Sequence, residues 1–115
     1  MSLKTLFSAQ AADGNSVAFK VREEAGQSNA EKVLLHGYGT WSGVSLHVEV
    51  CASPSASPQV WDAATQYDLT AVTFTDDFTV CLDVPSGTGI RGRISGTGSP
   101  VPSITLQARG DLVVA

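Results

Sequence analysis

Charged residues are scarce in this sequence. They make up 16% of its 115 residues, and seven Lys and Arg stand against eleven Asp and Glu, which gives a net charge of −4. Proteins that bind nucleic acid directly usually carry a basic patch, because neutralising phosphates supplies much of their affinity. The few cations of this acidic chain are scattered, so we expect no direct nucleic-acid partner.

Long apolar runs are missing as well. No stretch approaches the roughly 20 apolar residues that a membrane-spanning helix needs, so we expect no membrane partner. The N-terminal segment MSLKTLFSAQAA contains an Ala-Gln-Ala that imitates a cleavage site, but its apolar part is short and broken by Ser and Gln. It therefore does not predict a signal peptide, and the chain is expected to be made and kept in a cytoplasm.

Cysteine is rare, with Cys51 and Cys81 as the two examples. In a cytoplasm both are expected to be free thiols, because disulfides persist mainly in oxidising compartments. A disulfide between them stays geometrically open, provided that their strands are neighbours.

Small and apolar residues take the place of charge. Hydrophobic residues make up 43% of the chain, with eleven Gly and five Pro among the rest. Alternation of apolar and polar residues predicts half-buried strands. It is clearest in two segments, where the inward sets are Val44, Leu46, Val48 and Val50 in one, and Phe78, Val80, Leu82 and Val84 in the other. Weaker alternation covers residues 16–23, 31–39, 67–74, 89–95 and 103–109, and residues 111–115 could add an edge strand.

Turn signals separate these segments. They lie at residues 12–15, 25–29 and 53–58, and only residues 29–34 and 60–66 could hold a helical turn. Short strands that recur about every 8 to 12 residues between turns predict a sandwich or barrel. We therefore expect one all-β domain over residues 1–115, an antiparallel β-sandwich or jelly roll with Gly-, Pro- and Ser-rich turns. Residues 1–14 and 110–115 are candidate terminal arms.

The stretch SGTGIRGRISGTGSP contains the pattern G-x-G-x-x-G at Gly87, Gly89 and Gly92. A dinucleotide fingerprint needs a strand before these glycines and a helix that opens at the last one. Here Gly92 leads into Arg-Ile-Ser and then another Gly-rich turn, so no helix is expected. Two glycine turns that flank one short strand are the better interpretation, and we expect no cofactor.

Candidate catalytic and metal-binding groups are sparse. His36 and His47 are expected on adjacent strands, with Glu49 on the same face as His47, but a third nitrogen or thiolate ligand at suitable spacing is missing. Asp76 and Asp77 are typical of a hairpin tip and supply too few oxygens for calcium. The sequence also lacks a G-x-S-x-G nucleophile elbow. We therefore expect neither a metal site nor an enzyme.

Three aromatic residues lie near expected strand ends: Tyr38, Trp41 and Trp61. Exposed, they would stack on sugar rings in a carbohydrate-binding module or anchor a protein partner. Buried, they would close the ends of the sandwich core. The sequence alone leaves these alternatives open.

The segment GTWSGVSLHVEVCASPSASPQVWDAA resembles small β-rich proteins of tailed bacteriophages. The shared pattern is a glycine, a Trp, a Ser-Gly that opens a strand, a Ser/Pro loop and a second Trp. The later segments FTVCLDVPSG, GIRGRISG and SITLQ continue it, so the resemblance covers residues 31–108.

This resemblance implies a virion structural protein, most like the capsid decoration (cement) proteins. Such proteins dock on the outside of the shell as dimers or trimers and staple neighbouring capsid subunits. The implied partners are the major capsid protein and further copies of the chain, with the virion exterior as location. A neck, tail-knob or tail-fibre component, or a carbohydrate-binding module, remains as an alternative. Candidate interface residues are Phe7, Tyr38, Trp41, Trp61, Leu112, Val113 and Val114.

Overall fold

Strands make up the regular structure of the described part of the chain. A computed structural model describes residues 2–22, 30–65 and 72–115. Its strands are β1 (Ser2–Gln10), β2 (Gly14–Asn15), β3 (Phe19–Val21), β4 (Ala30–Thr40), β5 (Ser45–Cys51), β6 (Asp62–Ala63), β7 (Thr73–Phe74), β8 (Phe78–Pro85), β9 (Gly89–Ser95), β10 (Ser103–Gly110) and β11 (Leu112–Val114). Among these residues, no helix is long and apolar enough to cross a membrane.

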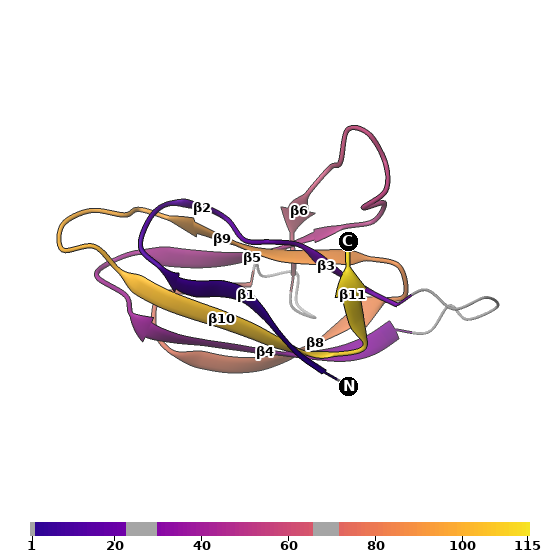
Figure 1. Ribbon diagram of the computed structural model, residues 1–115, viewed down its shortest axis with the longest axis horizontal. Helices are drawn as coiled ribbons and strands as arrows, with labels where there is room; N and C mark the ends of the chain where they lie inside the picture. Colours follow the sequence, from indigo (N-terminus) through magenta and orange to yellow (C-terminus); the bar gives the residue numbers. More distant parts are fainter. Residues whose placement is uncertain (1, 23–29, 66–71) are drawn as a thin grey trace.

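Two antiparallel sheets face each other (Figure 1). The first sheet has the strand order β1-β10-β4-β8, and the second has the order β11-β3-β9-β5-β6. In the second sheet β2 pairs beside β9, and β7 pairs beside β5. The predicted all-β sandwich is confirmed.

The core lies between the sheets because each long strand turns alternate side chains inward. Leu46 and Val48 of β5 are at most 1% exposed, as the alternation predicts. Other members of this core are at most 1% exposed and come from both sheets: Val33, Leu35, Ile90, Ile94, Ile104 and Leu106. Cys51 lies in the second sheet and Cys81 in the first, and both are free thiols, as expected.

The glycine-rich stretch forms two turns around one strand, as predicted. Gly87 before β9 has φ of 82°, and Gly96 after it has φ of 87°. Both values lie in a region that side chains other than glycine rarely adopt, so glycine makes these turns inexpensive. Gly89 and Gly92 lie within β9 itself, with no helix after them, so the stretch lacks the geometry of a dinucleotide site.

The expected N-terminal arm is instead part of a sheet, while the C-terminal residues form an edge strand, which the sequence had offered as the alternative to an arm. The strand β1 pairs with β10, beginning with Ser2 opposite Gly110, and β11 pairs with β3. The suggested helical turns are absent from the described residues, since β4 begins at Ala30 and β6 lies within residues 60–66. The expected turn at 25–29 and most of the expected strand at 67–74 lie outside the described residues.

We predict that Gly92→Ala destabilises the fold. A Cβ atom at Gly92 would lie 2.7 Å from Leu106 Cδ2 and 3.1 Å from Phe7 Cε2, where the two sheets meet. Overpacking of this kind costs about 1 to 3 kcal/mol, because the buried neighbours must shift. Urea unfolding should show this loss. Gly98→Ala is the matched control, since nothing lies within 4 Å of its added Cβ, and equal stability of both variants would contradict the packing argument.

Candidate interaction surface

Three of the four sheet edges are protected from pairing with a further strand. The register of β1 against β10 shifts twice, between Thr5 and Phe7 and between Phe7 and Gln10. On the second sheet the edges are short, because β11 has three residues and β6 and β7 have two each. Bulges and short strands are the usual ways of preventing an edge from pairing with another chain.

The fourth edge, β8, is long and regular. All eight of its residues pair with β4 in one unbroken register, from Phe78 opposite Gly37 to Pro85 opposite Ala30. Its other side pairs with no strand in the described part of the chain. Asp83 is its single charged residue, and Pro85 lies at its end. The edge therefore has none of the internal interruptions that protect β1.

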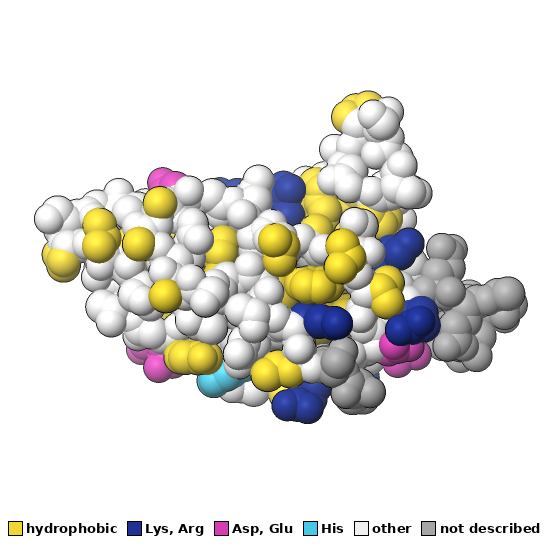
Figure 2. Space-filling view, in the orientation of Figure 1, with side chains coloured by type: hydrophobic (Ala, Val, Ile, Leu, Met, Phe, Trp, Pro, Cys, Tyr) yellow, Lys and Arg dark blue, Asp and Glu magenta, His cyan; other side chains and the backbone are white. Residues whose placement is uncertain are grey.

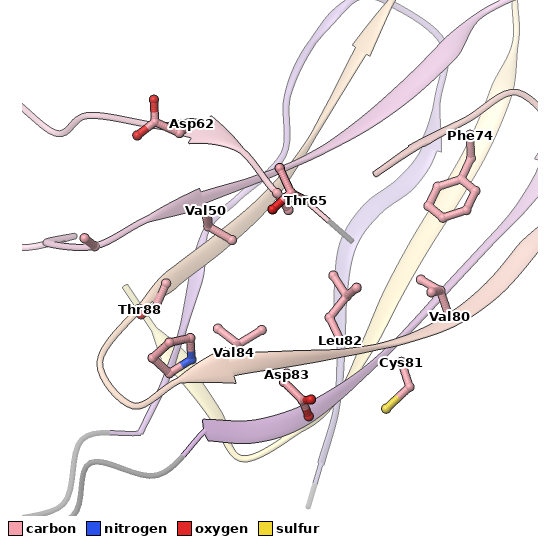
Figure 3. A pocket seen from close by; sticks show the side chains of 13 residues that line it. Val50, Asp62, Thr65, Phe74, Val80, Cys81, Leu82, Asp83, Val84 and Thr88 are labelled. Atoms are coloured by element: carbon pink, nitrogen blue, oxygen red, sulfur yellow. The ribbon is translucent and has the colours of Figure 1, made fainter. Parts of the chain in front are cut away.

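An apolar groove runs beside this edge, between β8 and the strands β5, β6 and β7 (Figure 3). Its volume is about 760 Å³. Val80, Leu82 and Val84 of β8 point into it, while Cys81 and Asp83 point to the opposite side of the strand. Val50 and Phe74 line the facing wall. Side chains of this kind suit apolar groups better than a polar substrate.

The inward side chains of β8 are incompletely covered. Phe78, Val80 and Leu82 are only half-buried, whereas Val84 is 2% exposed. Phe74 stacks on Phe78 with ring centroids 3.6 Å apart, which covers one part of the strand. The apolar side of β8 therefore has room for further contacts.

On the outer face of the first sheet, polar and apolar side chains alternate along the border between β4 and β8. Lys32 Nζ lies 3.0 Å from Asp83 Oδ1, in an exposed ion pair. The ring nitrogen Nδ1 of His36 lies 3.0 Å from Thr79 Oγ1. Leu34 lies opposite Cys81 in the register and is 39% exposed. This face therefore carries an apolar centre between two polar pairs.

The outer face of the second sheet carries the most concentrated charges. Glu49 lies between two arginines, with Oε1 2.9 Å from Arg91 Nε and Oε2 3.2 Å from Arg93 Nε. The Arg91 guanidinium also lies 4.3 Å from the centroid of the Trp61 ring. The segment between β5 and β6, which ends at Trp61, projects from the sandwich (Figures 1 and 2). Arg91 therefore links the projecting segment to the sheet.

The two histidines do not come together, contrary to the expected adjacent strands. His36 lies on β4 of the first sheet and His47 on β5 of the second. His47 contacts Thr73 Oγ1 and Ser95 Oγ at 3.2 and 2.8 Å. Within residues 2–22, 30–65 and 72–115, no group of three or more His, Cys, Asp or Glu is arranged to hold a metal ion.

Asp77 lies on the connection from the second sheet to the first instead of at a hairpin tip. The strands on either side of it, β7 and β8, belong to different sheets. Its Oδ1 accepts hydrogen bonds from the Trp41 indole, 2.7 Å away, and from the Gly39 backbone N–H, 3.1 Å away. The alternation of residues could not reveal this role, because it depends on which sheet each strand enters.

The candidate aromatic residues do not share one face. Trp41 is 8% exposed, with its ring centroid 6.3 Å from that of Phe78. Trp61 is half-buried on the second sheet, and its indole donates to Gln59 Oε1. Tyr38 is 39% exposed on the first sheet and stacks on His36. A common platform for a sugar ring is therefore not formed by these three.

The remaining interface candidates divide between core and surface. Phe7 and Leu112 are each 3% exposed, so the structure assigns them, together with Trp41, to core packing. Val113 is half-buried and Val114 is 76% exposed. The β8 edge was not among the candidates, although its alternating sequence predicts a strand, because a single sequence does not show which strand ends a sheet.

Comparison with known proteins gives a distant structural likeness. No protein-family model matches the chain, and no curated protein sequence matches it. The crystal structure of the VP2 subviral particle of infectious bursal disease virus is similar, with a TM-score of 0.39 and 11% sequence identity. The likeness covers 98% of this chain and 27% of the VP2 chain. At this level it indicates no function.

We predict that Glu49→Gln destabilises the protein by about 1 to 3 kcal/mol. The substitution leaves two partly buried guanidinium groups beside each other without their shared carboxylate. Asp83→Asn is the matched control, because both partners of that ion pair are at least 66% exposed and such pairs contribute at most about 1 kcal/mol. Urea unfolding of both variants checks the difference, and an equal loss would refute the role given to Glu49.

We also predict that acidification weakens the fold through His47. Burial lowers the pKa of His47 below its ordinary value of 6.5, and Arg93 lowers it further by repulsion. The unfolded chain then binds the proton at higher pH than the folded chain, so the free energy of unfolding falls as pH drops below 6.5 toward the folded pKa.

His47→Gln should reduce this loss between about pH 7.5 and about pH 5, as measured by urea unfolding at each pH. Asp13 does not interfere, because its pKa is lowered from 3.8, mainly by a side-chain hydrogen bond with Thr97. An unchanged pH profile in the variant would show that His47 is not responsible.

Proposed function

We propose that this protein is a non-enzymatic phage structural protein that decorates the outside of the capsid and joins neighbouring shell subunits. The observation that carries the proposal is the β8 edge, which pairs with no further strand among the described residues and lies beside an apolar groove of about 760 Å³. An open edge offers backbone hydrogen bonds, and the groove offers pockets for alternate side chains, which is how a sheet binds another extended chain.

The polar clusters of the described residues support a structural role over a catalytic one. Asp77 binds the Trp41 indole, Glu49 binds two arginines, and His47 contacts two hydroxyl groups. These interactions connect strands or sheets to each other. Groups used in this way stabilise the sandwich, which suits a rigid module in a shell.

The capsid exterior is favoured over other positions by two features. Residues 31–108 resemble small β-rich phage proteins of the decoration type, and the net charge of −4 disfavours contact with packaged DNA. The projecting segment between β5 and β6, with Val60 65% exposed, is a suitable contact for the shell (Figure 2). Decoration at many sites allows weak single contacts to stabilise the whole shell.

Copy number in purified particles tests this proposal. Quantitative mass spectrometry against the major capsid protein should give on the order of hundreds of copies, as a closed shell lattice requires. About a dozen copies or fewer would instead indicate a ring at the neck or tail. Finding none would exclude the virion role. Particles without the protein should also lose their contents at a lower temperature, and adding the purified chain should restore the original value.

A further inference from the structure

We propose that the β8 edge is covered by β8 of a second copy, in a two-fold antiparallel dimer centred on Cys81. The inference rests on the proposed function in one respect, since a protein that joins two shell subunits needs two shell-binding surfaces and a dimer supplies them. The strand pairing itself is inferred from the structure of the β8 edge. It would join two four-stranded sheets into one continuous sheet of the dimer.

We infer that a strand covers the β8 edge because β8 alone among the four sheet edges is both long and regular. Bulges protect β1, and shortness protects β11, β6 and β7, whereas β8 keeps a regular register over eight residues. The backbone N–H and C=O groups on its outer side are arranged to pair with an extended chain. The half-buried Val80 and Leu82 would then gain cover from the added strand.

The sequence of β8 is complementary to itself when the two-fold axis passes through Cys81. A two-fold axis perpendicular to the sheet keeps the inner faces of both copies on the same side, so inward residues must pair with inward residues. Centring on Cys81 places Val80 opposite Leu82 of the second copy, and Phe78 opposite Val84 of the second copy. The apolar groove of each copy then continues into the other across the axis.

Charge also favours this register. Asp83 is the only charged residue of β8, and a dimer centred on Asp83 would place two carboxylates directly opposite each other. Centring on Cys81 instead places Asp83 opposite Thr79 of the second copy, a hydroxyl that can donate to it. The two Asp83 residues are then about 13 Å apart along the strands, beyond the screening length at physiological salt.

The outer face at the axis is apolar as well. Leu34 lies opposite Cys81 within each copy and is 39% exposed. In the dimer, a row of four side chains would cross the axis at right angles to the strands. Leu34 and Cys81 of one copy would be followed by Cys81 and then Leu34 of the second copy. Self-complementarity on both faces, without opposed like charges, favours a second copy as the occupant.

Solution mass tests the dimer on the purified full chain, under reducing conditions so that no disulfide contributes. Analytical ultracentrifugation should give twice the 11.9 kDa of a single chain. Cys81→Lys should restore the single-chain mass, because two ammonium groups would meet at the axis, and circular dichroism should show that the variant is folded. Cys81→Thr, which introduces an uncharged side chain that is favoured in strands, should remain a dimer. A wild-type monomer at all concentrations, or a Cys81→Lys dimer, would overturn the proposal.

Oxidative crosslinking tests the register. Mild oxidation of the wild type should link Cys81 to Cys81, since directly opposed residues lie within disulfide range. In a Cys81→Ser background, the double variant Thr79→Cys/Asp83→Cys should crosslink, while Thr79→Cys alone should not. Crosslinking by Thr79→Cys alone, or failure of the double variant, would refute this register.

The two proposals fail in different ways. A monomer found at hundreds of copies per particle would overturn the dimer and leave decoration intact. A dimer that is missing from particles would retain the pairing and remove the virion role.

Discussion

Two sheets share one apolar interior, and the rest of the structure depends on this packing. Every strand that contributes to it must turn the same alternate set of side chains inward, because a shift of one residue would expose the whole set. The central inward residues of β5 and β9 are almost fully buried, with Leu46 and Ile90 both at 0% exposure. Register is therefore fixed at the centre of the sandwich, and variation is confined to its edges.

Polar groups are arranged around that interior as connectors. Asp77 lies on the connection between β7 and β8 and accepts hydrogen bonds from Gly39 and Trp41, which holds this connection against the end of β4. On the outer face of the second sheet, Glu49 of β5 forms ion pairs with two arginines of β9 and so links the two strands. Both carboxylates thus accept hydrogen bonds from groups distant in sequence.

The sequence predicted local features well and neighbour relations poorly. The alternation at residues 44–50 and 78–84 identified two strands and their inward faces, and the glycine turns at Gly87 and Gly96 were recognised. The separation of His36 from His47, and the place of β1 in the first sheet, were not recognised. These depend on pairings between distant segments, which one sequence with generic alternation does not encode. The open edge was missed for the same reason.

The pairing of the first strand has a consequence for the order of folding. The strand β1 has its hydrogen-bonded neighbour in β10, where Ser2 lies opposite Gly110. A ribosome therefore releases the first strand long before its partner exists, and loop closure over nearly the whole chain must precede that pairing. Leu6 and Phe7 lack the cover of β10 until that strand has been made, so the first sheet is completed late. Apolar side chains that wait for a distant partner strand favour aggregation in the meantime.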